Sequence, residues 1–410
     1  METKYLAFVI PAFFLFVGIE YLVALQKKNK QLFRFDSSVT NISIGIAERL
    51  INLFVSYAFF GMFVYVYKHY ALFHIPNHWT VWILLLLATD LVWYWYHRCG
   101  HEINILWGAH VVHHQSEEFN YTVSARVTTI QAFMRNIFWC VLPLIGFHPS
   151  LIITISVIHA GYSFFTHTQI IGKLGWLEYI FITPSHHRVH HASNEKYLNK
   201  NYGDLFVFWD KLFGTFQKEE EEPVYGLTHP LKSQSFIWQH FHYYIELFAA
   251  VRRERNVGKI ISILLGPPEL LDPGLRLALE KKILPPKKSV RLTYRFRIYL
   301  LTQLALSLIL LFLISYFFSA LGLVEKTTGL IFVLITLINC GALLEQRKWI
   351  FYLEYIRLVV LGCYVSFLFE SIFFLLIVVS ITGIIVSLES VKKWYYGFIY
   401  QEYNDILAKK

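Results

Sequence analysis

The sequence predicts an all-α fold, a polytopic membrane helical bundle with a cytosolic histidine-rich helical cap. Three observations predict it: 56% of the 410 residues are hydrophobic and only 16% are charged, several apolar runs are long enough to cross about 30 Å of hydrocarbon, and most of the 18 histidines lie close together in the sequence. Average soluble domains are roughly 25% charged. The composition therefore excludes a disordered chain and disfavours a soluble one.

Seven apolar runs are expected to cross the membrane as helices. They are Tyr5–Leu25, Leu50–Tyr67, Trp79–Tyr96, Ile298–Val324, Gly329–Leu344, Phe351–Phe369 and Ile372–Leu388. Two shorter runs, Phe133–Phe147 and Leu151–Phe165, flank a His-Pro-Ser break and form either a tight transmembrane hairpin or a re-entrant one. The expected count is therefore about nine spans, or seven plus a re-entrant hairpin.

Basic residues orient the bundle. Three lysines and Arg34 follow the first span, whereas the loop after the second span holds only Lys68. Because cytoplasmic loops carry the excess of Lys and Arg, the first loop faces the cytosol. Counting the spans forward from that loop places residues 97–130 and 166–297 on the cytosolic side as well. The protein is expected in the endoplasmic reticulum membrane of a eukaryote or the inner membrane of a bacterium. The net charge of +9 suits an anionic membrane surface, and no nucleic-acid partner is expected.

Composition shifts divide the chain into three parts. Residues 1–265 form the membrane body that carries all the histidines, with its motifs between 83 and 230. Residues 266–297 are rich in proline and lysine and read as a linker. Residues 298–410 form a four-span extension without histidine. Within the body, the run of four glutamates Glu219–Glu222 is expected to be a solvated loop.

Three spaced histidine groups dominate the body. They are His97-x-x-x-His101, His110-x-x-His113-His114 and His187-x-x-His190-His191. Residues three and four apart share one face of a helix, so each group projects its imidazoles toward one point. Eight ligands exceed the four of a tetrahedral zinc site, and the spacing therefore predicts two metals. Imidazole suits iron, zinc, copper and nickel, so the element stays open.

Other polar residues near these groups are candidates for the same site. His167 at the inner end of the hairpin is a further candidate ligand, Glu102 adjoins His101 as a candidate catalytic residue, and Asn194 follows the third group. Asp90 lies inside the third span, seven residues before His97 and nearly on the same face. Intramembrane carboxylates are costly and usually functional. We expect Asp90 to accept the second N–H of an imidazole, with pairing to another helix as the alternative.

The segments that carry these residues resemble the fatty acid hydroxylase/sterol desaturase superfamily of membrane di-iron oxygenases. The matching segments are 90–102, 110–120, 183–191, 199–203 and 209–216. Within the superfamily, the chain is most similar to the alkylglycerol monooxygenase branch. That similarity lies in residues 183–191, in Tyr225–Pro230 and in the multi-span C-terminal extension with Leu344-Glu-Gln-Arg347.

The resemblance implies a non-haem centre of two iron ions that uses O₂, with tetrahydrobiopterin as the electron donor of the branch. It implies hydroxylation of the carbon next to the ether oxygen of a 1-O-alkylglycerol, a membrane lipid, to give a fatty aldehyde and a glycerol. The eight grouped histidines would be the iron ligands, and Glu102 would be needed at the site. The sequence has no GxGxxG element and no cytochrome-type haem motif, so electrons must come from a separate molecule or protein.

Two other functions fit parts of the pattern. One is a hydroxylase or desaturase of sterols, sphingolipids or fatty acyl chains that is fed by a small redox protein. The other is a membrane metal transporter, whose ligands would be expected along the spans near the midplane. Seven of the eight grouped histidines fall outside the predicted spans and His97 lies at the edge of one, which disfavours transport.

Overall fold

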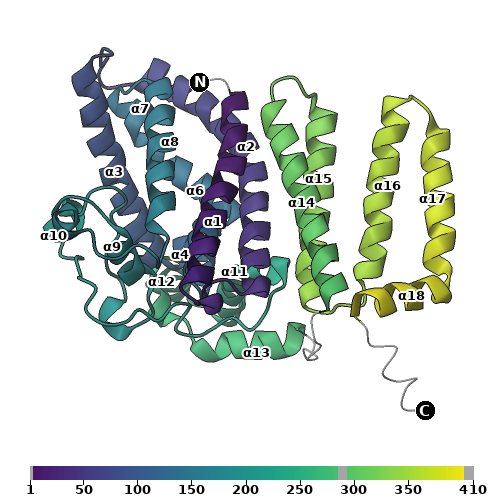
Figure 1. Ribbon diagram of the computed structural model, residues 1–410. Helices are drawn as coiled ribbons and strands as arrows, with labels where there is room; N and C mark the ends of the chain where they lie inside the picture. Colours follow the sequence, from purple (N-terminus) through teal and green to yellow (C-terminus); the bar gives the residue numbers. More distant parts are fainter. Residues whose placement is uncertain (1–2, 285–292, 401–410) are drawn as a thin grey trace.

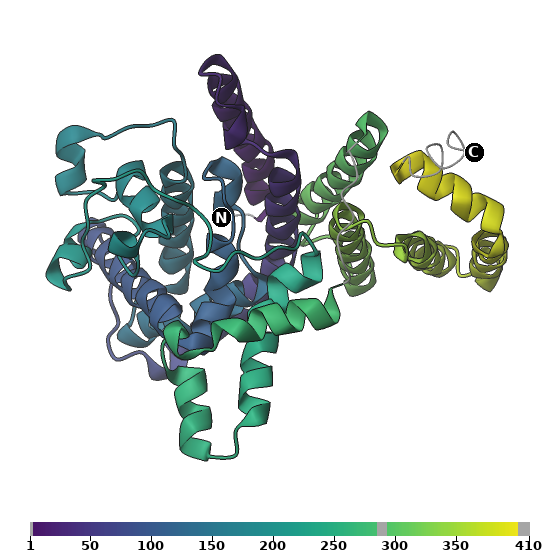
Figure 2. The same ribbon diagram turned by 90° about the horizontal axis from the view of Figure 1, so that it is seen from below.

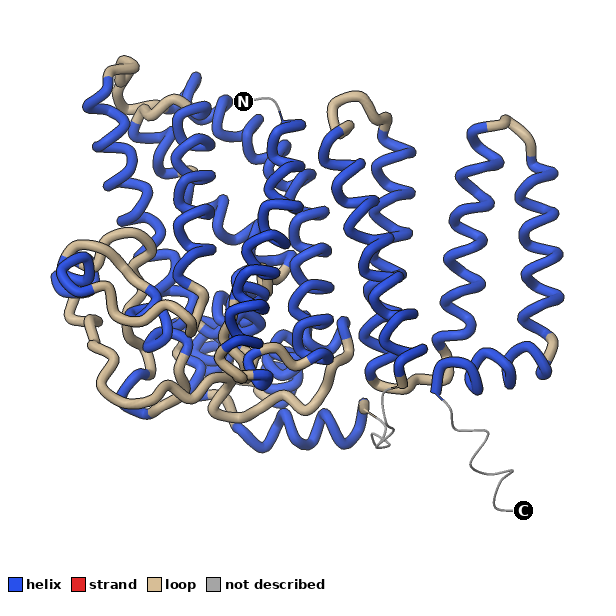
Figure 3. The backbone as a smooth tube through the Cα atoms, in the orientation of Figure 1, coloured by secondary structure: helices blue, strands red, loops and turns tan. Residues whose placement is uncertain are grey.

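The computed structural model describes residues 3–284 and 293–400. Within these ranges every regular element is a helix, which confirms the all-α prediction (Figures 1 and 3). The long helices stand side by side, and the short helices that carry most of the histidines gather at one end of them (Figure 1). We call this end the histidine face.

Seven helical segments are long and apolar enough to cross a membrane, which confirms a polytopic membrane protein. Four lie in the body: a segment Lys4–Gln26 that includes α1 (Val9–Gln26), α2 (Phe35–Tyr70), α3 (Trp79–Glu102) and α8 (Pro149–Thr166). Three lie in the C-terminal extension: α14 (Tyr294–Tyr316), α15 (Leu323–Leu344) and α16 (Ile350–Leu368).

Two of the expected spans differ in detail. The expected span Ile298–Val324 is shorter in the structure, because α14 ends at Tyr316 and a turn leads from there into α15. The last run becomes α17 (Ile372–Ser387), which has 16 residues and is followed by α18 (Glu389–Tyr400) at a bend of 77°. Helix α18 therefore lies across the end of the bundle instead of extending α17 (Figure 1).

The hairpin that follows α3 reaches the end of the bundle opposite the histidine face. It consists of α6 (Thr129–Trp139), α7 (Val141–Ile145) and α8. Near its tip, the carbonyl oxygens of Leu144 and Ile145 accept hydrogen bonds of 2.8 and 3.1 Å from the backbone N–H groups of Leu72 and Phe73, in the loop between α2 and α3. This contact favours the crossing alternative over the re-entrant one.

Gly146 makes the tight approach at this tip possible. Its φ is +124°, and a Cβ there would lie 1.9 Å from the carbonyl oxygen of Phe73. Any side chain would therefore push the tip away from the α2–α3 loop.

Two apolar cores meet on α2, the longest helix. One core joins α2 to α11 (Phe236–Arg253), α14 and α15 through Leu50, Leu304 and Leu337. The other joins α2 to α3 and the hairpin through Phe63 and Leu85. The outward faces of the long helices expose large apolar side chains, as lipid contact requires. The body and the first half of the extension therefore share one core.

The short elements of the histidine face position the candidate site. They are α4 (Asn104–His110), the 3-10 helix η3 (Val111–His114), α5 (Tyr121–Ser124), α9 (Pro184–His191) and α10 (Phe208–Leu212). Next to them, α11 (Phe236–Arg253) and α12 (Val257–Leu265) form an antiparallel pair that projects from the bundle when it is seen from below (Figure 2).

The segment expected to be a linker contains helix α13 (Pro273–Ile283). This helix is packed on α11, where Arg276 Nε lies 2.8 Å from Glu246 Oε1. The Pro285-Pro286-Lys287-Lys288 break lies outside the described residues.

Candidate metal centre

The structure brings all nine candidate histidine ligands together, although they come from five separate elements. His97 and His101 lie on the last turns of α3, His110 ends α4, His113 and His114 lie in η3, His167 follows the last residue of α8, and α9 carries His187, His190 and His191. Each of these side chains is at most 8% exposed. The short helix α9 is fixed at its start by Pro184 and by a capping box between Thr183 and His186.

The nine imidazoles form two groups, within each of which the candidate ligand atoms lie within 4.8 Å of one another. The group of five contains His97, His101, His110, His114 and His190, and the group of four contains His113, His167, His187 and His191. The sequence groups are thus divided between the two: η3 and α9 each contribute histidines to both. This division follows from the helical twist, which turns adjacent residues to different sides.

Facing Nε2 atoms define the centre of each group. In the group of five, His110 Nε2 lies 3.1 Å from His97 Nε2 and 3.2 Å from His114 Nε2. In the group of four, His167 Nε2 lies 3.1 Å from His113 Nε2 and 2.9 Å from His187 Nε2.

Backbone carbonyls fix the tautomer of four of these imidazoles. The Nδ1 atoms of His97, His113, His167 and His190 lie 2.7–3.2 Å from the carbonyl oxygens of Tyr202, Arg126, Ser163 and Lys200, respectively. Because a carbonyl only accepts hydrogen bonds, each Nδ1 carries the proton and donates it. The lone pair of Nε2 therefore points into the cluster, which is the usual arrangement of a metal-bound histidine.

The buried nitrogens lack other partners. The Nε2 atoms of His101, His190 and His191 are buried and have no hydrogen bond. Burial, and then the neighbouring imidazoles, lower the pKa well below 6.5 for His110, His113, His114, His187, His190 and His191. These residues are therefore neutral at pH 7, and an unpaired buried acceptor costs about 1–3 kcal/mol. Converging neutral imidazole nitrogens of this kind fit a transition-metal ion such as iron.

Asp90 does not contact the nine imidazoles, and the expectation that it orients one of them is wrong. Its carboxylate accepts hydrogen bonds from the backbone N–H groups of Leu205 and Phe206 at 2.9 and 3.1 Å and from Trp209 Nε1 at 3.0 Å. Its oxygen also lies 3.7 Å from Nδ1 of His159 on α8. Asp90 therefore anchors the segment that follows Tyr202 to helix α3. The carbonyl of Tyr202 in turn orients His97.

Two further candidates lie outside both histidine groups. Glu102 forms an ion pair with Arg98 on the same helix, at 2.9 Å, and its side chain is 43% exposed. Asn194 donates a hydrogen bond of 3.0 Å to Glu221 Oε1 and accepts one of 2.8 Å from the backbone N–H of Val224. Asn194 thus holds a neighbouring loop.

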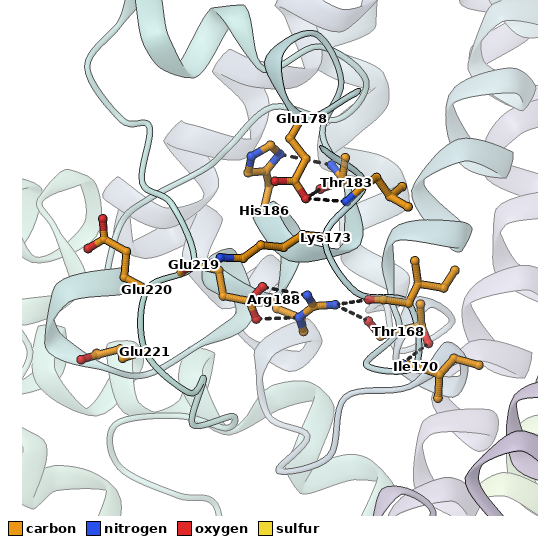
Figure 4. Close-up of polar contacts among 12 residues, drawn as sticks. Thr168, Ile170, Lys173, Glu178, Thr183, His186, Arg188, Glu219, Glu220 and Glu221 are labelled. Carbon is orange, nitrogen blue, oxygen red and sulfur yellow. Dashed lines mark hydrogen bonds and ion pairs between the residues drawn. The ribbon is translucent and has the colours of Figure 1, made fainter. Parts of the chain in front are cut away.

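One residue of the glutamate run, Glu219, holds helix α9 in place (Figure 4), whereas Glu220, Glu221 and Glu222 are exposed as expected. Arg188 on α9 donates two hydrogen bonds of 2.7 Å to the carboxylate of Glu219, and its third nitrogen reaches the carbonyl oxygens of Thr168 and Ile171. Thr168 directly follows His167, so this contact connects two parts of the group of four. The expectation was wrong for Glu219 because a charge run does not reveal a distant cationic partner.

Sequence reasoning missed a second supporting carboxylate, Glu20 on α1. It is fully buried and accepts hydrogen bonds from the backbone N–H of Tyr121, at 2.7 Å, and from the hydroxyl of Thr168. A charge inside the first apolar run was the signal that could have found it.

Comparison with known proteins identifies the family. Residues 82–215 match the fatty acid hydroxylase family model. The chain is 33% identical over 356 residues to alkylglycerol monooxygenase of Homo sapiens, an alignment that covers 85% of this chain and 79% of that protein. This chain belongs to the alkylglycerol monooxygenase family. The relative from Danio rerio is 30% identical over 87% of this chain and 81% of its own length.

Membership of the alkylglycerol monooxygenase family makes the chain a membrane lipid monooxygenase and hence an oxidoreductase. The segment that matches the fatty acid hydroxylase model contains all nine candidate histidine ligands. Cholesterol 25-hydroxylase of Homo sapiens is 26% identical over 33% of this chain. No solved structure matches the chain.

Proposed function

We propose that the protein is a di-iron monooxygenase that cleaves the ether bond of 1-O-alkylglycerols with O₂ and a reduced pterin, tetrahydrobiopterin. The observation that carries the proposal is the pair of histidine groups with inward-facing nitrogens, in a chain whose relatives are named for this substrate. The group of five would hold one iron and the group of four the other. When bound, the irons would supply the transfer of one oxygen atom from O₂ to a C–H bond, which no side-chain acid or base can perform.

The position of the histidines suits a lipid substrate. Helices α3 and α8 are apolar along their length and carry His97, His101 and His167 at or just beyond their ends. The alkyl chain of a lipid can therefore stay in the bilayer while its head reaches the histidines. Since all nine imidazoles are at most 8% exposed, the site also keeps bulk water away from the reacting carbon.

The overall reaction balances with one O₂ and one two-electron donor for each substrate molecule. The carbon next to the ether oxygen is the favoured target because that oxygen stabilises electron deficiency on it. One oxygen atom becomes the hydroxyl on this carbon, and the other leaves as water with two electrons and two protons from the tetrahydropterin, which becomes a dihydropterin. The resulting hemiacetal breaks its C–O bond to release a fatty aldehyde and a glycerol.

We also propose that the histidine face lies in the cytosol. The basic residues that support this are near the ends of helices on that face: Arg34 precedes α2, and Arg252 and Arg253 end α11. In a eukaryotic host the protein would lie in the endoplasmic reticulum membrane, and in a bacterium in the inner membrane.

Turnover of a labelled lipid tests the proposal. The purified iron-loaded protein is incubated with a 1-O-alkylglycerol, tetrahydrobiopterin and ¹⁸O₂. We expect fatty aldehyde only when both the pterin and O₂ are present, with ¹⁸O in the aldehyde when it is trapped by reduction to the alcohol. Turnover of a sterol or an acyl chain with no cleavage of the ether lipid would contradict the proposed substrate.

A further inference from the structure

A polar cavity of about 190 Å³ opens on the histidine face. It lies between the start of α2, the segment after η3 and the start of α11. Leu231 is the one apolar residue among those that line it. None of the nine candidate ligands lines this cavity, so it is separate from the metal centre.

The wall of the cavity holds a buried carboxylate that lacks hydrogen bonds. The side chain of Glu118 is 7% exposed, and neither of its oxygens has a hydrogen-bond partner of good geometry. Its ion-pair partner is the half-exposed Arg34, whose Nε lies 3.2 Å from Glu118 Oε1. Because its close cation is half exposed, this buried carboxylate would be stabilised further by N–H donors that a ligand brings to it.

The lining also includes a buried cation, Arg126, which is surrounded by neutral acceptors. Arg126 is 3% exposed, and its guanidinium donates hydrogen bonds of 2.5–2.7 Å to Gln239, Gln115, Asn41 and the carbonyl of Val112. No carboxylate is among these acceptors. The cavity lining therefore contains a buried carboxylate and a buried guanidinium, in addition to Arg34, Asp36, Glu117 and Lys232.

This cavity is also connected to the metal centre by the backbone. The carbonyl of Arg126 accepts the Nδ1–H of His113 at 3.2 Å, and Gln115 directly follows His114. A molecule bound in the cavity would thus lie next to residues that carry or orient candidate ligands in both groups. It would enter from the aqueous side, whereas a lipid would enter from the bilayer.

We propose that this cavity binds the electron donor, a reduced heterocycle of the pterin class, through Glu118 and Arg126. This inference rests on the proposed function, which requires such a donor. The pyrimidine edge of a pterin carries an amino group and a ring N–H side by side, which match the two oxygens of a carboxylate. The ring carbonyl beside them would accept a hydrogen bond from Arg126. Each turnover takes two electrons and two protons from the tetrahydropterin and leaves a dihydropterin.

Binding of tetrahydrobiopterin under anaerobic conditions tests this assignment without turnover. We would measure its Kd for the iron-loaded parent, for Glu118→Gln and for Leu231→Trp, which narrows the cavity from its rim without touching Glu118. The matched control is Glu195→Gln, which removes the same charge from an exposed position outside the cavity. We expect Kd to rise at least about tenfold in both cavity variants, because charge-assisted paired hydrogen bonds or the binding space are lost. The control should keep the parental Kd, and all four proteins should keep the same iron content.

Each contrary result has a distinct meaning. If the parent binds the pterin and both cavity variants bind it equally well, the cavity assignment is wrong while the proposed function stands. If the parent binds no pterin but cleaves the ether lipid with a small redox protein, both this assignment and the pterin in the proposed function are wrong. Loss of iron from Glu118→Gln would also overturn the assignment, since Glu118 would then support the metals.

Discussion

At the scale of single residues, position in space and not position in a motif decides which histidines can bind metal. His167 stands alone in the sequence, yet its Nε2 lies between those of His113 and His187. His186 directly precedes a ligand motif, yet its Nδ1 accepts a hydrogen bond from the backbone N–H of Thr183 at the start of α9. Whether His167 or His186 binds metal therefore distinguishes a site defined by geometry from a site defined by sequence motifs.

His167→Ala should lower the iron content by about one ion per chain and abolish turnover, because the group of four would lose its central nitrogen. The control is His186→Gln, whose amide oxygen can still accept the hydrogen bond from Thr183. We expect this variant to keep its iron. Metal analysis of the two purified proteins checks the prediction, and iron loss from His186→Gln with full retention in His167→Ala would reverse the assignment.

Asp90→Asn should destabilise the protein by about 1–3 kcal/mol, because an amide cannot accept all three hydrogen bonds that the carboxylate accepts. Since Asp90 does not touch a candidate ligand, iron should remain bound at low temperature. Thermal unfolding in detergent and metal analysis measure the two effects. Complete loss of iron without loss of stability would show instead that Asp90 acts on the metals.

At the scale of elements, the loop that contains Glu219 fixes the orientation of α9. Helix α9 has only eight residues, so its own hydrogen bonds stabilise it little. The paired hydrogen bonds between Arg188 and Glu219 supply the missing support. Burial acts to raise the pKa of Glu219, but the hydrogen bonds from Arg188 and Ser185 and the positive charges of Arg188 and Lys173 together outweigh it and bring that pKa below 4.5.

Glu219→Gln should lower the free energy of unfolding by about 1.5–3 kcal/mol at pH 7. Because the pKa of Glu219 is lower in the folded protein, its contribution is present above pH 4.5 and is lost as the pH falls through the folded value. The difference in melting temperature between parent and variant should therefore shrink below pH 4.5. A difference that grows in acid would contradict this prediction.

At the scale of the whole molecule, α2 joins a histidine-bearing body to a helical extension, and the chain passes repeatedly between two opposite faces. The α2–α3 loop and the tip of the α6–α8 hairpin share one face, while the histidines share the other (Figure 1). The proposed orientation places the histidine face in the cytosol.

Cysteine labelling in sealed membranes tests this arrangement. In a chain whose four native cysteines are replaced by serine, Asn77→Cys and His148→Cys should react with an impermeant reagent on the side away from the cytosol. Lys196→Cys should react only from the cytosolic side. Labelling of position 148 from the cytosolic side would restore the re-entrant alternative for the hairpin.

The sequence predicted the features that depend on local patterns, namely the apolar spans and the three spaced histidine groups. It could not divide the histidines between two metals, because His113 and His114 are neighbours in sequence and face different groups. It also could not find the partners of Asp90 and Glu219, which lie on segments distant in sequence. Glu20 was accessible in principle, since a carboxylate in an apolar span requires a partner.

We propose that the nine histidines hold two irons, one in each group. Iron analysis of the purified parent protein, together with His101→Ala/His190→Ala from the group of five and His187→Ala/His191→Ala from the group of four, tests it most directly. We expect two irons per chain in the parent and one in each double variant. A single iron in the parent, or the loss of all iron from only one of the double variants with full retention in the other, would contradict it.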